Sequence, residues 1–276
     1  MKISQTGAMN TLTTAGSPAG EPLPVRVGLA GTANTRDLGG YRTADGLQVR
    51  AGLLYRSDSP HRLAGDDIAV FERLGIRTIV DLRSYAELDR LGRPPLAPTV
   101  RVYLHAPLRV AAPGDVAAGN LPAGLRLDAD LTLGAVYRHF LAQSDAEIRA
   151  ILRLLSDEQA YPALFYCVAG KDRTGIVAAL VLALLGVPDE TIAADYAATA
   201  DSFARFLELA RQDDALGDLG RGQAAASLLG AEAETMLSFL GWIRAEYGSV
   251  EKLAAAIGID GTAIDALRRT LLTASS

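Results

Sequence analysis

The chain has 276 residues, with 27 lysines and arginines against 32 aspartates and glutamates, a formal net charge of −5, and a single cysteine. One cysteine excludes an internal disulfide and a zinc site built from several thiolates. The three histidines lack metal-site spacing, so no metal and no cofactor is expected. An acidic chain without runs of basic residues is a poor nucleic-acid binder. The most apolar run, residues 176–187, is shorter than the roughly 20 residues of a membrane span, so we expect no stable membrane insertion.

Strand and helix patterns alternate through the first part of the chain. Residues 1–24 are rich in Gly, Ser, Thr and Pro and lack the apolar core of a secretory signal, so they are predicted to be a flexible tail. Strands are predicted at 53–56, after a hairpin turn at 43–46, and at 77–82, 100–104 and 163–166. Helices are predicted at 64–74, 136–142, 146–155 and 176–185. An Ala/Gly/Pro-rich loop is predicted at 111–124.

From residue 189 onward every predicted element is a helix. These helices cover residues 190–199, 202–212, 232–247, 250–257 and 262–272. The Gly-rich interval 216–230 interrupts them and is a candidate hinge. Early strands with helices between them, followed by a helical half, indicate an α/β sheet that carries a helical C-terminal part.

The segment from Phe165 to Gly175, FYCVAGKDRTG, joins an apolar strand to an apolar helix. A loop of this size before a helix can wrap around an oxyanion, because its backbone N–H groups point inward and the helix N-terminus is electropositive. The predicted phosphate-binding residues are Val168, Ala169, Gly170, Lys171, Asp172 and Arg173.

Three side chains of this segment suggest phosphate chemistry. Arg173 offers a planar fork for two phosphate oxygens. The same groups would favour the thiolate of Cys167, which stands six positions earlier and would act as a nucleophile. Thr174 can donate a hydrogen bond to that thiolate, while Gly170 and Gly175 let the backbone turn and the helix start close to the anion.

The Cys-x5-Arg spacing alone is only a weak indication of phosphate chemistry, and two other interpretations compete with it. Cys167 can be an inert buried thiol at a strand end. A nucleotide-binding P-loop is rejected, because position 165 is Phe instead of Gly and Asp172 follows Lys171 where Ser or Thr is required.

Several motifs together resemble the bacterial cysteine-dependent tyrosine phosphatase family. Besides the loop, the resemblance includes NTRDLGG at 34–40, YRS at 55–57, VDLR at 80–83 and the tail motifs YGSVE at 247–251 and LRR at 267–269. It covers roughly residues 30–272.

This resemblance implies a central, mostly parallel sheet flanked by helices, with a helical C-terminal lid. The expected organisation is one phosphatase domain at 25–276, with 201–240 as the lid insertion. The implied activity is hydrolysis of phosphotyrosine through a phosphocysteine, with phosphate as product. Phosphoserine, phosphothreonine and phosphoinositides are further implied substrates. We expect a cytoplasmic protein, with secretion without a signal peptide left open.

The resemblance makes Asp172 the candidate general acid, with a helix N-terminal charge as the alternative. The residues around it have further expected roles. Asp81 is the second candidate acid, although we favour a role in orienting loop groups. Lys171 is expected to be either a mobile charge at the rim that favours doubly phosphorylated or inositol substrates, or an ordinary exposed lysine. Asp37 and Arg36 are expected to brace the sheet.

Two further pairs complete the expected site. Arg56 and Arg83, both just past strand ends, are predicted to make the cleft positive. Phe203 and Phe206 can line a lid, although core packing is the more common role at their spacing.

One position departs from the family pattern. Tyr166 stands where the family usually has His, which keeps a second hypothesis open: a phosphate-binding module without turnover. Sulfur or arsenate chemistry on the same loop is a third, weakened by the absence of a second cysteine.

Overall fold

A six-stranded sheet forms the centre of the protein. The computed structural model describes residues 24–95, 98–108, 133–216 and 230–275. The strand order is β1-β2-β4-β7-β5-β6, in which β4, β7, β5 and β6 run parallel and β2 is antiparallel to both of its neighbours, β1 and β4. The strands are β1 (Val25–Arg26), β2 (Arg36–Asp37), β4 (Leu54–Ser57), β7 (Ala163–Tyr166), β5 (Thr78–Asp81) and β6 (Val102–His105). The predicted α/β fold with a mostly parallel sheet is therefore confirmed.

Strand β7 lies between β4 and β5 and is buried on both faces. Its side chains alternate, so that Leu164 and Tyr166 face one core while Ala163 and Phe165 face the other. The continuous apolar run predicted as a strand is therefore the two-sided pattern of a central parallel strand.

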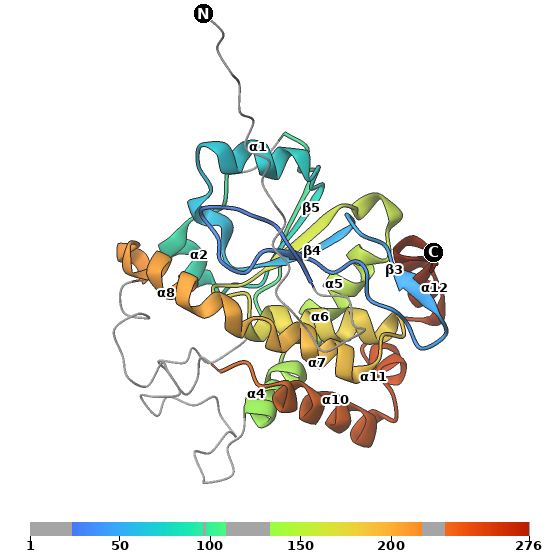
Figure 1. Ribbon diagram of the computed structural model, residues 1–276. Coiled ribbons are helices and arrows are strands. Elements are labelled where there is room, and N and C mark those ends of the chain that lie inside the picture. Colours follow the sequence, from blue (N-terminus) through green and yellow to red (C-terminus); the bar gives the residue numbers. More distant parts are fainter. Residues whose placement is uncertain (1–23, 96–97, 109–132, 217–229, 276) are drawn as a thin grey trace, which may run out of the picture.

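Helices cover the two faces unequally (Figure 1). On one face α1 (Asp66–Arg73) packs Phe71 against the core that holds Tyr166. The opposite face carries a thick helical layer made of α4 (Leu133–Ala142), α5 (Asp145–Leu155), α6 (Asp172–Leu184), α7 (Asp189–Ala197), α10 (Ala233–Tyr247) and α11 (Val250–Ala256). Helix α6 lies inside this layer and is buried on almost all sides, which explains its uniformly apolar sequence.

The remaining elements connect these layers. They are β3 (Leu47–Val49), the 3-10 turns η1 (Pro60–Arg62), η2 (Glu158–Ala160), η3 (Ala200–Ser202) and η4 (Asp214–Leu216), and the helices α2 (Tyr85–Leu91), α8 (Phe203–Arg211) and α12 (Gly261–Leu271). Within the described ranges, no helix is long and apolar enough to cross a membrane.

Most predicted elements are present with boundaries shifted by a few residues, and three differences matter. Helix α2 was not predicted. Helix α6 begins at Asp172 instead of residue 176, so Asp172 and Arg173 belong to its first turn. The C-terminal part is not purely helical, because β8 (Leu272–Ala274) pairs antiparallel with β3. The predicted loop at 111–124, the tail up to residue 23 and residues 217–229 of the hinge lie outside the described residues.

Candidate active site

The predicted phosphate loop lies at the carboxyl ends of the parallel strands. Cys167 directly follows β7, and five residues later the chain enters α6 at Asp172. The Cys167 thiol is free and only 3% exposed. Because β7 is flanked by β4 and β5, the loop is bordered by the segments that follow those two strands.

The carbonyl groups of this loop are held from outside. The Asn34 side-chain amide donates to the carbonyls of Ala169 and Gly170 at 3.2 and 3.1 Å, and Arg56 donates through Nη2 to the Gly170 carbonyl at 2.8 Å. The Ser59 N–H donates to the carbonyl of residue 168 at 3.0 Å.

These contacts orient the peptide planes of the loop. In a trans peptide the C=O and the following N–H point in opposite directions. With the carbonyls of residues 168, 169 and 170 directed outward, the N–H groups of residues 169, 170 and 171 are directed toward the inside of the loop. That arrangement suits an anion and disfavours a cation.

Gly170 is required by this geometry. Its φ is +66°, and a Cβ would lie 2.6 Å from the backbone of Ser57 and Asp58. Gly175 has a different role from the one expected: it lies within α6, and a Cβ there would approach the ring of Tyr196 to 3.0 Å. Gly175 therefore makes room for Tyr196 rather than for the anion.

Arg173 is oriented by a carboxylate that the sequence analysis missed. Its Nη1 and Nη2 donate to the two oxygens of Glu87 at 2.5 and 2.8 Å, and Nη1 also lies 3.4 Å from the Leu82 carbonyl. Burial lowers the pKa of Arg173, but the hydrogen bond and charge of Glu87 outweigh it and the pKa is raised. Burial likewise raises the pKa of Glu87, and Arg173 outweighs it to give a value of about 2.

The contact with Glu87 uses only one edge of the guanidinium. Among the described residues, the hydrogen bonds of Arg173 involve Nη1 and Nη2 but not Nε–H, and only one hydrogen of Nη2 is used by Glu87. The Nε–Nη2 edge of Arg173 is thus the edge that can bind two oxygens of a phosphate.

A sequence signal for Glu87 existed. Ser84 and Glu87 form a reciprocal capping box at the start of α2, with the Glu87 carboxylate accepting from the Ser84 N–H at 2.7 Å. The pattern Ser-x-x-Glu is the signature of such a helix start. It predicts α2, but not that Glu87 also reaches Arg173.

Asp172 and Lys171 occupy the end of the loop. Asp172 Oδ1 accepts from the Tyr137 hydroxyl at 2.6 Å and lies 3.4 Å from Lys171 Nζ. The Lys171 ammonium also lies 5.9 Å from the ring centroid of Phe203, and Lys171 is buried. The expected mobile or ordinary exposed lysine is therefore wrong for this structure, because α8 and Asp172 enclose its side chain.

Asp81 is the centre of a separate buried cluster. It accepts from Nε and Nη2 of Arg83, and the hydroxyls of Tyr103 and Tyr166 donate to its Oδ2 at 2.5 and 2.8 Å. Burial raises the pKa of Asp81, but Arg83 outweighs it and the pKa is lowered. With the Arg83 N–H, which donates to Oδ1 at 3.0 Å, Asp81 accepts from five donors. An ionised carboxylate with five donors orients its neighbours better than it donates a proton, which suits a supporting role for Asp81.

Tyr166, which replaces the usual His, is part of that cluster. Its ring lies 5.2 Å from the Arg83 guanidinium carbon, and the side chain is fully buried. The residue before Cys167 is thus a tyrosine held by Asp81, where the family resemblance implies a histidine.

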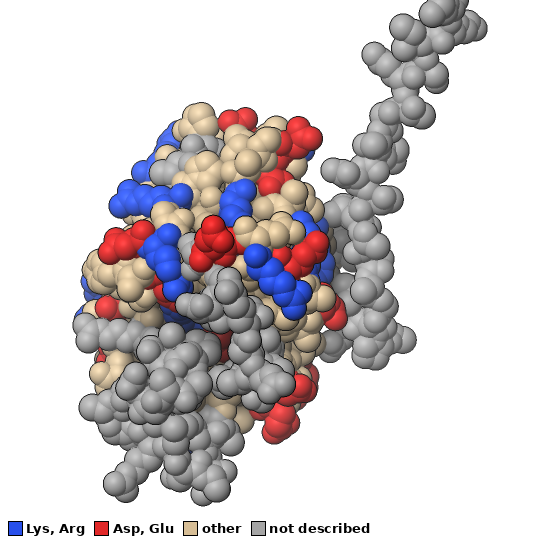
Figure 2. Space-filling view, turned by 90° about the vertical axis from the view of Figure 1, so that its left-hand side faces the viewer, with Lys and Arg blue, Asp and Glu red and all other residues tan. Residues whose placement is uncertain are grey.

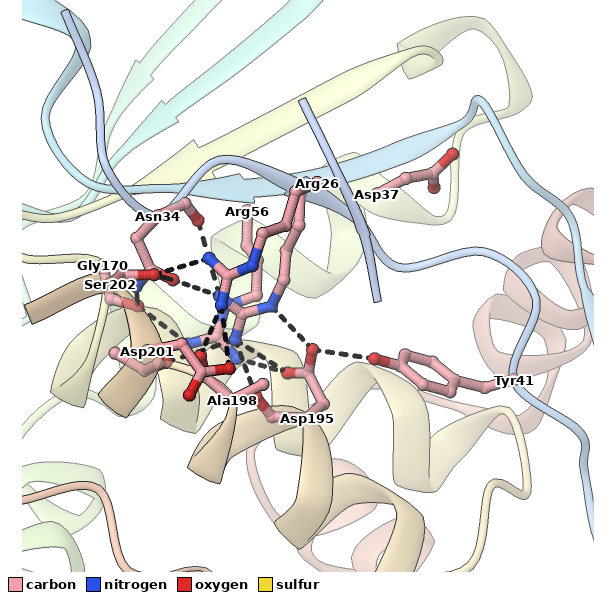
Figure 3. A network of polar contacts seen from close by, with 12 residues as sticks. Arg26, Asn34, Asp37, Tyr41, Arg56, Gly170, Asp195, Ala198, Asp201 and Ser202 are labelled. Carbon is pink, nitrogen blue, oxygen red and sulfur yellow. Dashed lines mark hydrogen bonds and ion pairs between the residues drawn. The ribbon is translucent and has the colours of Figure 1, made fainter. Parts of the chain in front are cut away.

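The second strand-end arginine, Arg56, is also fully buried. Figure 3 shows its guanidinium group near Asp195 of α7, with which it forms an ion pair. Arg36 pairs with the same carboxylate, and its Nε donates to Asp195 Oδ1 at 2.9 Å. The Tyr41 hydroxyl donates to the same oxygen at 3.0 Å. Burial and the two arginines act in opposite directions on the pKa of Asp195, and the arginines dominate and lower it.

The prediction that Arg56 and Arg83 make the cleft positive is therefore not supported. Both arginines are fully buried and paired with Asp195 and Asp81. Figure 2, which views the side that carries α2 and α8 in Figure 1, shows basic and acidic side chains intermixed on that surface.

The two remaining supporting residues, Asp37 and Thr174, lie in different parts of the structure. Asp37 accepts from the N–H groups of Gly39 and Gly52 at 2.8 and 2.5 Å, and in Figure 3 it points away from the Asp195 cluster. It braces the turn after β2, as expected, and does not contact the loop. The Thr174 hydroxyl is buried in the first turn of α6 without a hydrogen-bond partner in the described residues.

Part of the predicted lid packs on the loop. Phe206 and Ala210 of α8 share an apolar cluster with Val168 of the loop and Leu91 of α2, and Ala169 packs against it. In Figure 1, α8 and α2 lie near each other at the same end of the sheet. Among the described residues, no group of three or more His, Cys, Asp or Glu is placed to hold a metal ion.

Comparison with known proteins agrees with the phosphatase resemblance. A family model described as "Tyrosine phosphatase family" matches residues 27–273. The chain belongs to this tyrosine phosphatase family. It is accordingly a protein tyrosine phosphatase, as the resemblance of its motifs implied.

Two relatives illustrate this membership. A putative tyrosine-protein phosphatase of Cupriavidus necator is 32% identical over 237 residues, which covers 83% of this chain and 82% of the relative. The triple specificity protein phosphatase PtpB of Mycobacterium tuberculosis is 30% identical over 275 residues, covering 88% and 98%. Among solved structures, P. aeruginosa TpbA matches with 20% identity and a TM-score of 0.30, over 66% of this chain and 98% of TpbA.

Proposed function

We propose that the protein hydrolyses phosphate monoesters through a phosphocysteine on Cys167. The observation that carries the proposal is the loop itself: its outward-held carbonyls, its inward N–H groups and the remaining edge of Arg173 meet beside the chain's single thiol. Donors fixed in this way stabilise the charge of the transferring phosphoryl group without reorganisation during the reaction.

The reaction has two steps. The Cys167 thiolate attacks phosphorus, the P–O bond to the leaving group breaks, and Asp172 donates its proton to that oxygen. Water then attacks the phosphocysteine, the P–S bond breaks, Asp172 takes a proton from the water, and phosphate leaves. The buried and unpartnered Thr174 hydroxyl supports a hydrogen bond to the sulfur as the thiolate is released.

We propose phosphotyrosine as the main substrate. Phosphoserine, phosphothreonine and phosphoinositides are further candidates; the relative PtpB is called a triple specificity phosphatase. Helix α8, which packs on Val168 and against Lys171, is the proposed lid. Since it encloses Lys171, a phosphoinositide would need α8 to move before its second phosphate could reach that lysine.

The test is turnover of p-nitrophenyl phosphate by the wild type and Cys167→Ser, with thermal unfolding to verify folding. We expect the variant to lose at least about a thousandfold in kcat/KM. Acid quenching during turnover of a radiolabelled phosphotyrosine peptide should leave label on the wild type and none on Cys167→Ser. Full turnover by Cys167→Ser would refute the mechanism.

Three further measurements decide between this mechanism and the alternatives. Micromolar binding of vanadate by the wild type with no turnover would show a phosphate-binding module. Gain of turnover in Tyr166→His would then show that the loop is weakened by the tyrosine. Arsenate reduction by the wild type would favour the third hypothesis.

A further inference from the structure

Two buried tyrosines from different helices converge on Asp172. Tyr137 of α4 lies 2.6 Å from Asp172 Oδ1 through its hydroxyl, and 2.7 Å from the hydroxyl of Tyr196 on α7. Their rings meet edge to face with centroids 6.2 Å apart. Both side chains are at most 1% exposed.

The direction of these hydrogen bonds follows from the number of protons. A phenol carries one O–H, and an ionised carboxylate only accepts. Burial raises the pKa of both Tyr137 and Tyr196, so both keep their protons. The Tyr137 hydroxyl therefore donates its hydrogen bond to Asp172, and the Tyr196 hydroxyl donates to the oxygen of Tyr137. The chain of donation runs from Tyr196 through Tyr137 to Asp172.

This chain distinguishes the two oxygens of Asp172. The Tyr137 hydroxyl and the Lys171 ammonium both contact Oδ1 of Asp172. A proton on Oδ1 would face two donors, so the proton of the acid form belongs on Oδ2. The Asp172 side chain keeps 26% exposure, so Asp172 is not sealed by these contacts.

We propose that Tyr137, oriented by Tyr196, is a positioning residue that fixes Asp172 with Oδ2 as the proton-donating oxygen. The inference rests on the proposed function, in which Asp172 protonates the leaving group. A carboxylate in the first turn of a helix is already stabilised by the helix dipole and needs no side-chain partner for that purpose.

The surrounding packing supports a fixed arrangement. Gly175 leaves the space that the Tyr196 ring occupies, since a Cβ there would lie 3.0 Å from it. Phe239 of α10 packs edge to face on Tyr137, with centroids 5.9 Å apart. These contacts involve rings only, so a phenylalanine at either tyrosine position keeps them while removing the hydroxyl.

The test uses aryl phosphates that differ in their need for an acid. Phenyl phosphate has a poor leaving group that requires protonation, whereas p-nitrophenyl phosphate has a good one. For Tyr137→Phe we expect kcat/KM to fall about tenfold on phenyl phosphate and less than about twofold on p-nitrophenyl phosphate. Asp172→Asn should show the same pattern with about a hundredfold loss on phenyl phosphate. The double variant should be no slower than Asp172→Asn alone.

Tyr161→Phe is the matched control. Tyr161 is another buried tyrosine, and its hydroxyl donates to the Leu155 carbonyl, away from the loop. Its removal should leave both substrates unaffected. If Tyr137→Phe fails to fold, Tyr196→Phe takes its place, with the same direction and a smaller effect.

The outcomes separate the two proposals. Equal losses on both substrates, or no loss, in a folded Tyr137→Phe or Tyr196→Phe would overturn the positioning role while Cys167→Ser remained inactive. Turnover that survives in Cys167→Ser would instead overturn the proposed function.

Discussion

Two arginine–carboxylate clusters border the predicted phosphate loop, and they differ in whether a guanidinium edge remains for a ligand. Behind the loop, Arg36 and Arg56 share Asp195, and Arg56 also holds the Gly170 carbonyl. At the N-terminus of α6, Arg173 pairs with Glu87 through one edge of its guanidinium. The first cluster is completely buried, whereas the Glu87 and Arg173 side chains are 18% and 11% exposed.

The comparison shows that an arginine near a strand end is not by itself a ligand-binding charge. Arg36 and Arg56 are buried and share the single negative charge of Asp195, and Arg56 acts through the loop backbone that it positions. Arg173 keeps an edge for an external anion because Glu87 fixes the opposite edge. Four predictions test this difference between the Asp195 cluster and the Arg173–Glu87 pair, from the largest expected effect to the smallest.

Arg173→Lys should lower kcat/KM for p-nitrophenyl phosphate about a thousandfold, or about 4 kcal/mol of transition-state stabilisation. Lysine keeps the charge but lacks the fork that contacts Glu87 and two phosphate oxygens together. Arg268→Lys on α12, whose Nε donates to the Leu184 carbonyl, is the control and should retain activity. Near-normal turnover by Arg173→Lys would contradict the assignment of its remaining edge.

Asp195→Asn should lower the free energy of unfolding by about 3 kcal/mol at pH 7, because two buried guanidinium groups lose their shared charge. Urea denaturation measures the loss. Asp201→Asn is the control, since Asp201 makes only an exposed contact with Arg26 at 3.5 Å and should cost little. Equal, small losses in both variants would mean that the buried cluster does not hold the loop.

Glu87→Gln should lower the free energy of unfolding by about 2 kcal/mol near pH 6. The pKa of Glu87 in the folded protein is about 2, below its ordinary 4.5, so its contribution is complete above pH 4.5 and is lost as the pH falls toward 2. Urea denaturation of the wild type and Glu87→Gln at several pH values should show their difference shrinking over that range. A difference independent of pH would argue against the Glu87–Arg173 pair.

Asn34→Ala should weaken phosphate inhibition about fivefold, or about 1 kcal/mol, because two carbonyls of the loop lose the same amide donor. Competitive inhibition of p-nitrophenyl phosphate turnover gives the measurement. Gln48→Ala, which removes a single donor to the Gly40 carbonyl, is the control. Unchanged inhibition in Asn34→Ala would mean that the loop keeps its orientation without this support.

The sequence predicted what is close along the chain. Cys167, Arg173 and the strand–loop–helix order around them lie within one segment, so their spacing carries the information. Their partners are distant: Glu87 lies 86 positions from Arg173, and Tyr137 lies 35 positions from Asp172. Such pairings depend on the packing of helices on the sheet, which periodicity does not specify.

The same reasoning explains the fold elements that were missed. Helix α2 has only seven residues, too few for a clear periodic pattern, although its capping box was readable. Strand β8 follows directly on α12 and exists because β3 provides a partner, with the nearest pair, Val49 and Leu272, 223 positions apart. The burial of Arg56 and Arg83 was equally hidden, because nothing in their local sequence distinguishes a paired arginine from a cleft-lining one.

The most direct test is a crystal structure of Cys167→Ser with a phosphotyrosine peptide bound. We expect phosphate oxygens to accept hydrogen bonds from the N–H groups of residues 169–171 and from Nε and Nη2 of Arg173, while Glu87 keeps its contact on the other edge. Phosphate bound elsewhere, or bound to Arg173 with Glu87 displaced, would contradict the proposed site.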